Sequence, residues 1–227
     1  MVTLLLRLQG PMQSWGTTSR FDERDTQMEP SKSGVLGLIC AALGRDRKEE
    51  IQDLAKLRMG VRSDREGVPM RDYQTVGGDR DRRKKTLLIA SGDTQARTVV
   101  SPRFYLADAA FLVGLEGDDR SLLETVHSAL RTPVWPLALG RKSFVPGSPV
   151  HLSNGLQGWG LMEALRSYPR LVSSGNRQPS DRLRISIENE NEGSMRLDQP
   201  IAPFAERRFG PRFVRSEVID VSDSPNA

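Results

Sequence analysis

The chain has few of the residues that hold small secreted proteins or metal-binding proteins together. Its single cysteine, Cys40, cannot form an internal disulfide bond, and one thiol with two histidines cannot supply the four ligands of a structural zinc site. Leu4-Leu5-Leu6 is interrupted by Arg7, and no apolar run approaches the roughly 20 residues of a membrane span. We therefore expect a cytoplasmic protein without a metal, a cofactor or a membrane contact.

The basic residues are unevenly distributed. The net charge is +4, from 33 Lys and Arg against 29 Asp and Glu. The segment from Arg71 to Arg103 alone holds eight basic and four acidic residues, an excess that equals the whole net charge. Of the 33 basic residues 27 are arginine, whose forked guanidinium matches phosphate oxygens. The pattern favours an anionic partner, although a GC-rich coding sequence would also raise the arginine content.

Hydrophobic periodicity predicts an α+β protein of one large domain or two small ones. We expect strands at Thr3–Leu8, Met59–Asp64, Met70–Val76, Thr86–Ala90, Val99–Leu106, Ala109–Leu115, Leu183–Glu188 and Arg212–Val221, and helices at Val35–Leu43, Lys48–Leu57, Ser121–Leu130 and Leu161–Tyr168. The order over residues 1–140 fits a ferredoxin-like (RRM-like) βαββαβ core. Residues 141–227 are expected to form a small, irregular, β-rich C-terminal region packed on that core.

A charged segment at about residues 76–100 interrupts this core. Gly77-Gly78 precedes a run of cations, which are Arg80, Arg82, Arg83, Lys84 and Lys85. Glycines that flank short apolar pieces are typical of a projecting β-hairpin rather than of a buried strand.

Pro30-Ser31-Lys32-Ser33-Gly34 opens the first apolar helix. The N-terminus of a helix presents free N–H groups and partial positive charge, so Ser31, Lys32 and Ser33 could meet a phosphate there. The spacing of a nucleotide-hydrolysing phosphate loop is absent, so ATP hydrolysis has little support. The alternative is plain N-capping of the helix by serine.

Three further features suit a nucleic-acid surface. Trp15 lies in a polar loop and could stack on a base, although covering a sheet edge is the commoner role of a loop tryptophan. Arg71 with Tyr73, and Arg103 with Tyr105, alternate along two strands and predict one solvated face of arginine and tyrosine. Arg141-Lys142 follows Gly140 in a turn that could approach phosphates; each could also be ordinary surface.

The two histidines offer no recognisable catalytic arrangement. His127 falls within an amphipathic helix and His151 follows a loop rich in proline and glycine. No Ser/His/Asp spacing accompanies them, so the sequence does not indicate a hydrolase.

Five ordered motifs resemble the CasD-type subunits of type I-E CRISPR Cascade complexes, in the RAMP superfamily. They are Arg7–Gly16 (RLQGPMQSWG), Pro30–Leu38 (PSKSGVLGL), Met70–Val76 (MRDYQTV), Tyr105–Phe111 (YLADAAF) and Leu139–Ser143 (LGRKS), with Phe204–Arg208 (FAERR) more loosely similar.

The resemblance implies an RRM-like palm, a β-hairpin thumb at about residues 76–100 and no catalysis. It also implies that the protein binds the 5′ handle of the guide RNA beside the Cascade backbone subunit and the large PAM-reading subunit, and meets target DNA through the assembled complex. The residues it assigns to the handle are Gln13, Trp15, Ser31, Lys32, Ser33, Arg71, Tyr73, Arg103, Tyr105, Arg141, Lys142 and Ser143.

Two alternatives stay open. One is a metal-independent RNA endonuclease, as in type I-C counterparts, which would need groups such as Tyr73, Tyr105, His127 and Lys142 to converge. The other is a protein–protein adaptor whose basic arm contacts no RNA.

Overall fold

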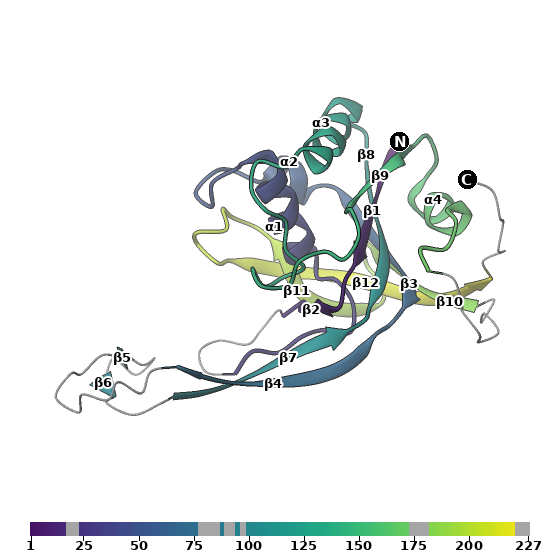
Figure 1. Ribbon diagram of the computed structural model, residues 1–227. Helices are drawn as coiled ribbons and strands as arrows, with labels where there is room; N and C mark the ends of the chain where they lie inside the picture. The colour runs from purple at the N-terminus through teal and green to yellow at the C-terminus, as the bar shows by residue number, and fades with distance from the viewer. Residues whose placement is uncertain (17–22, 77–86, 89–93, 96–98, 173–181, 221–227) are drawn as a thin grey trace.

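The computed structural model describes residues 1–16, 23–76, 87–88, 94–95, 99–172 and 182–220 (Figure 1). Its elements are β1 (Val2–Gln9), β2 (Met12–Gln13), α1 (Lys32–Leu43), α2 (Gln52–Ala55), β3 (Arg58–Arg65), β4 (Val68–Val76), β5 (Leu87–Leu88), β6 (Thr94–Gln95), β7 (Val99–Ala107), β8 (Ala110–Gly117), α3 (Arg120–Arg131), β9 (His151–Gln157), α4 (Leu161–Ser167), β10 (Arg182–Asn189), β11 (Ser194–Pro200) and β12 (Phe209–Asp220).

An antiparallel, seven-stranded sheet forms the centre of the molecule. Its strand order is β11-β12-β10-β3-β8-β1-β9. Successive side chains of a strand point to opposite faces, so Leu4, Leu6 and Leu8 of β1 pack toward α1 and α3 while Leu5 packs toward α4. Figure 1 shows α1, α2 and α3 on one side of the sheet and α4 on the other. The protein is therefore a mixed α/β structure with few helices and two hydrophobic cores.

The long central elements agree with the sequence prediction, and the short or late ones differ. The predicted helix at residues 48–57 shrinks to the single turn of α2. Strands β9 and β11 were not expected, because their residues show little alternation. The sheet also continues across residue 140, because β9 to β12 complete it.

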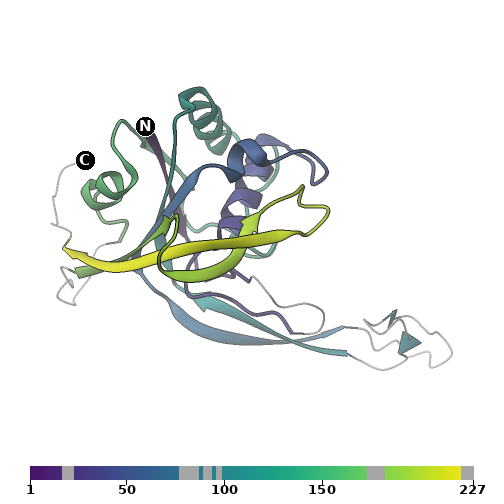
Figure 2. The ribbon, with the colours of Figure 1, turned by 180° about the vertical axis from the view of Figure 1, so that it is seen from behind.

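Strands β4 and β7 form a long antiparallel ribbon that leaves the body of the molecule (Figures 1 and 2). Its register runs from Val68↔Ala107 at the base to Val76↔Val99 at the outer end. The short pair β5–β6 lies beyond it. The predicted cations Arg80, Arg82, Arg83, Lys84 and Lys85 lie outside the described residues.

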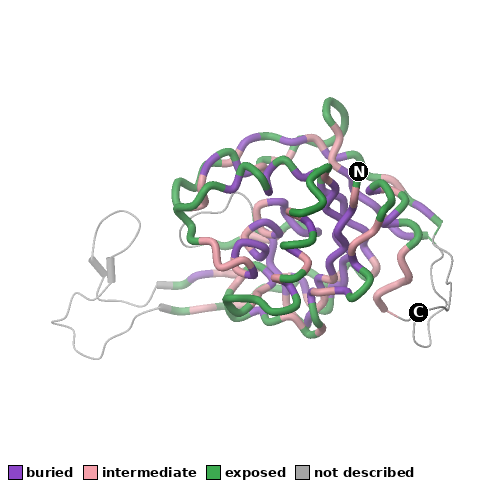
Figure 3. Tube along the Cα trace, turned by 90° about the horizontal axis from the view of Figure 1, so that it is seen from above, coloured by how far each residue is buried: buried purple, intermediate pink, exposed green. Residues whose placement is uncertain are grey.

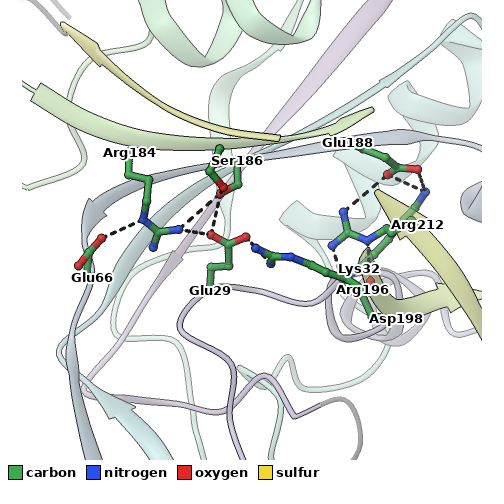
Figure 4. A network of polar contacts seen from close by, with 10 residues as sticks. Glu29, Lys32, Glu66, Arg184, Ser186, Glu188, Arg196, Asp198 and Arg212 are labelled. Carbon is green, nitrogen blue, oxygen red and sulfur yellow. Dashed lines mark hydrogen bonds and ion pairs between the residues drawn. The ribbon is translucent and has the colours of Figure 1, made fainter. Parts of the chain in front are cut away.

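A network of buried charges joins the start of α1 to the C-terminal strands (Figure 4). Asp198 of β11 accepts two bonds from Arg212 of β12, at 2.6 and 2.9 Å. In the second half of the network, Glu29 pairs with Arg184 and Arg196. Figure 3 shows that the buried residues are concentrated within the body of the molecule. Removing one ion of a buried pair leaves the other charge unpaired away from water, which is destabilising.

Candidate functional site

An open groove of about 1560 Å³ runs over α1. Its walls are the segment after α3, the β11–β12 connection and the stretch around Arg24. The groove-lining cations are Arg24, Arg45, Arg47, Arg141, Lys142 and Arg207, and the groove-lining acids are Asp25, Asp46 and Glu206. This excess of positive charge suits an anionic ligand.

Small residues of α1 form the floor of the groove. Ser33, Gly34, Gly37 and Ala41 recur at helical spacing and all line it. Gly34 has a second constraint, because a Cβ there would lie 2.9 Å from Cε3 of Trp15. From Gly34 onward the helix can therefore be apolar and still offer an open surface.

Trp15 packs beneath this floor. It is 1% exposed, and its indole N–H donates to Oε1 of Gln13 at 3.1 Å. Gln13 is buried as well, and its amide donates to the carbonyl oxygens of Leu8 and Ala109 at 3.1 and 2.8 Å. Because these polar groups are already paired, Trp15 follows the packing alternative rather than the stacking prediction, and Gln13 does not reach the groove.

A carboxylate of the protein itself, that of Asp198, is already bound at the N-terminus of α1. The backbone N–H of Lys32 donates to Oδ2 of Asp198 at 2.7 Å. The Lys32 ammonium lies 3.0 Å from Glu188, away from the groove, and burial lowers its pKa despite the opposing effect of Glu188. The prediction that Lys32 meets a phosphate is therefore corrected.

Ser31 and Ser33 both line the groove, and their predicted contact with a phosphate stays a prediction. Ser31 is the N-cap residue, but its side chain makes no capping hydrogen bond, so plain capping does not account for it either.

Arg141 is the strongest candidate for an anion contact. Its Nη2 donates to the carbonyl oxygens of Phe104 at 2.8 Å and Arg24 at 3.3 Å, and its guanidinium lies 5.3 Å from the centre of the Phe144 ring. Its Nη1 is buried and has no acceptor among the described residues. Burial lowers the pKa of Arg141, and the charges of Arg103 and Arg24 lower it further while Asp72 opposes them. A phosphate oxygen would supply the missing acceptor and neutralise the crowded cations.

Gly140 fixes the position of Arg141. Its φ is 91°, a left-handed value that favours glycine, and a Cβ there would lie 1.7 Å from the carbonyl oxygen of Ser14. The N–H of Ser14 donates to the carbonyl of Leu139 at 3.0 Å, which joins the turn to the first loop. Lys142 is exposed and lines the groove next to Arg141, while Ser143 is exposed but lies outside the lining.

The register of the ribbon separates the two predicted arginine–tyrosine pairs. Arg71 is opposite Phe104 and Tyr73 opposite Pro102, so these two side chains share a face that excludes Arg103 and Tyr105. Tyr73 is 66% exposed on that face. The prediction of one continuous arginine–tyrosine face is therefore wrong.

On the other face, Arg103 and Tyr105 lie beside the groove. Tyr105 contacts the Phe144 ring at a centroid distance of 5.9 Å, and Nε of Arg103 donates to Ser101 at 3.3 Å. Tyr105 thus packs against the ring that Arg141 also contacts, and the charge of Arg103 acts on Arg141, but neither residue lines the groove.

Sequence reasoning missed several groove residues, including Trp135, Arg24, Arg45 and Arg47. Trp135 lies between two prolines in Pro133-Val134-Trp135-Pro136, a local signal for a stiff, surface-exposed aromatic that could have been recognised. The arginines could not have been recognised, because segments far apart in sequence bring them together.

The histidines lie elsewhere. Nε2 of His127 donates to the carbonyl of Leu152 at 2.8 Å, and its ring stacks on His151 at 4.3 Å. Within the described ranges, no three His, Cys, Asp or Glu side chains are arranged to hold a metal ion. None of the helices in that part of the chain is both long and apolar enough to cross a membrane.

Comparison with known proteins shows the family to which this chain is related. Residues 3–215 match the family described as CRISPR-associated protein (Cas_Cas5). The chain belongs to the Cas5 family. It is 34% identical over 162 residues to the CRISPR system Cascade subunit CasD of Escherichia coli strain K12, covering 66% of this chain and 69% of that one.

Two solved structures share the whole Cas5 fold. One, titled "Crystal structure of Cas protein", is 49% identical with a TM-score of 0.79 and covers 99% of this chain and 100% of its own. A chain of a "CRISPR RNA-guided surveillance complex" is 32% identical with a TM-score of 0.79 and covers 96% of this chain and 90% of its own. This Cas5 protein is therefore similar to a component of an RNA-guided assembly.

Proposed function

We propose that this Cas5 protein is a non-catalytic, RNA-binding subunit of a Cascade-type CRISPR surveillance complex. It holds the 5′ handle of the guide RNA in the groove over α1, in the cytoplasm. The observation that carries the proposal is Arg141, whose buried Nη1 has no acceptor among the described residues and which lies in a groove with an excess of cations.

The groove suits single-stranded RNA better than a smaller anion. Its six cations come from several segments of the chain, so several phosphates could bind along the groove. They are Arg24, Arg45, Arg47, Arg141, Lys142 and Arg207. The glycines of the floor let a backbone approach closely. The Arg71–Tyr73 face of the ribbon would meet a different part of the RNA, or a neighbouring subunit.

The topology supports a ferredoxin-like palm. Strands β3-β8-β1-β9 are adjacent and antiparallel in that order, with α1 and α3 on one face, as expected for a βαββαβ unit whose second helix leads into β9. The β4–β7 ribbon would then be the base of the thumb. In the assembly we place the protein at one end of the backbone, between the backbone subunit and the large PAM-reading subunit, so that target DNA is met only by the complex.

The endonuclease alternative has less support. Tyr73 and Tyr105 lie on opposite faces of the ribbon, and His127 is engaged with Leu152 and His151. A general base must reach the 2′-hydroxyl that it activates, and these groups do not converge.

The direct test removes the cations of the Gly140 turn. The variant Arg141→Ala/Lys142→Ala should lose RNA affinity, because each charge-assisted contact contributes about 1.5–3 kcal/mol, or about 10- to 150-fold in Kd. The control Lys56→Ala/Arg166→Ala removes two exposed cations outside the groove and should bind as the parent does. Unchanged binding of handle RNA by the first variant would favour the adaptor alternative.

A further inference from the structure

Trp135 is an exposed aromatic side chain of the groove that the proposed phosphate contacts do not use. It lines the groove, and it is 43% exposed, whereas Trp15 of the same groove is 1% exposed. Exposing a large indole to water is unfavourable unless a ligand covers it, so an exposed tryptophan within a concave cationic surface indicates a contact point.

The backbone holds this indole in place before any ligand arrives. The N–H of Trp135 donates to the carbonyl of Ala41 at 3.1 Å, and the N–H of Val134 donates to that of Ala42 at 3.0 Å. Pro133 and Pro136 fix φ on both sides of the pair. A platform held in this way loses little conformational entropy on binding.

The position along α1 suits a base rather than a phosphate. Trp135 is attached to the last turn of α1, where the helix dipole is negative, whereas Ser33 lies at the positive end. From Ser33 to Ala41 the helix rises about 12 Å, at about 1.5 Å per residue. Trp135 and Arg141 line the same groove, so an RNA strand whose phosphate meets Arg141 could place a nearby nucleobase at Trp135.

The first basic residue after the end of α1 that lines the groove, Arg45, is partly neutralised by an acid. Arg45 makes two bonds to Asp53, at 2.7 and 2.5 Å, and these bonds raise its pKa. The Arg47 guanidinium donates to the carbonyl of Phe204 at 3.2 Å. Arg45 is thus paired with a carboxylate, whereas Arg47 stays exposed and charged, and the indole of Trp135 adds an exposed aromatic face to this end of the groove.

We propose that Trp135 is a stacking platform for one nucleobase of the single-stranded RNA in the groove. This rests on the proposed RNA-binding function. Stacking needs only a π-face, so the platform would hold a base without selecting its identity. Arg141 would anchor the backbone, and Trp135 would set the position of the base along the groove.

The test compares three single variants of the full-length protein. Trp135→Ala should weaken binding of a handle-sequence RNA oligonucleotide by about 5- to 150-fold, the range for loss of one stacked base. Trp135→Phe keeps an aromatic face and should restore most of the affinity. Trp159→Ala removes a tryptophan that is 50% exposed outside the groove, and it should bind like the parent.

A second readout identifies the stacked base. A series of RNA oligonucleotides, each with 2-aminopurine at one position, should show quenching that depends on Trp135 at one or two positions only. Circular dichroism and thermal unfolding of each variant confirm that it is folded.

The outcomes separate this inference from the proposed function. If the parent does not bind RNA, the proposed function fails. If the parent binds RNA, Arg141→Ala/Lys142→Ala loses binding and Trp135→Ala does not, only the stacking platform is refuted. If Trp135→Ala impairs assembly with other subunits at unchanged RNA affinity, Trp135 contacts a protein and the stacking proposal is also refuted.

Discussion

At the scale of single residues, the backbone conformation of one glycine determines where two cations of the groove lie. Gly140 allows the turn that carries Arg141 and Lys142, because its φ of 91° and its contact with Ser14 leave no space for a side chain. Arg141 and Lys142, which the sequence motif singled out, both line the groove, and their binding to RNA stays a prediction. Sequence reasoning misplaced Lys32, because the buried partner Glu188 is 156 residues away and no local pattern indicates that pairing.

Gly140→Ala should therefore destabilise the protein. The left-handed backbone costs about 1–3 kcal/mol for a non-glycine residue, and the overlap with the Ser14 carbonyl adds to it. Urea unfolding measures the loss. Gly158→Ala is the matched control, because nothing lies within 4 Å of its added Cβ, and it should be nearly neutral. Equal stability of the two variants would contradict the role assigned to Gly140.

His151 should make stability depend on pH. Burial, then the neighbouring His127 and Arg131, lower its pKa in the folded state below 6.5. A group with a lowered folded pKa binds protons more readily when unfolded, so its contribution is complete above about 6.5 and is lost as the pH falls through the folded pKa. The free energy of unfolding, measured from pH 7.5 to 5, should decrease less in His151→Asn than in the parent. Parallel curves would exclude this contribution.

At the scale of elements, contacts between residues far apart in the sequence determine features that local sequence patterns do not predict. The sequence predicted both strands of the ribbon from their alternation, and also that Arg103 and Tyr105 share a face. It could not predict that Arg71 and Tyr73 lie on the opposite face, because this depends on the register between strands. The apolar run of α1 was equally recognisable, but its start at Lys32 rather than Val35 depends on Asp198.

Asp198→Ala should destabilise the junction between α1 and the C-terminal strands. The substitution removes the acceptor of the Lys32 N–H and the main partner of the buried Arg212 guanidinium, which keeps only Glu188 at 3.9 Å, and we expect this to cost about 3–5 kcal/mol. Chemical denaturation measures the change, with the exposed Glu192→Ala as the control. A loss below about 1 kcal/mol would show that the network in Figure 4 is not important for stability.

At the scale of the whole molecule, one sheet joins the N-terminal and C-terminal halves and supports a groove on one side. The groove needs α1, the segment after α3 and the β11–β12 connection together, so its cations become a site only when the fold is complete. The ordered motifs of the sequence predicted the family, which the match over residues 3–215 confirms.

The most direct test of the central claim is photocrosslinking in the assembled complex. Guide RNA with 4-thiouridine at single positions of the 5′ handle or the spacer would be assembled with this protein and its partner subunits, irradiated and mapped by mass spectrometry. Handle positions are expected to crosslink to peptides that contain Trp135 or Lys142. Crosslinks confined to spacer positions, or to the exposed face around Tyr73, would contradict the assignment of the groove.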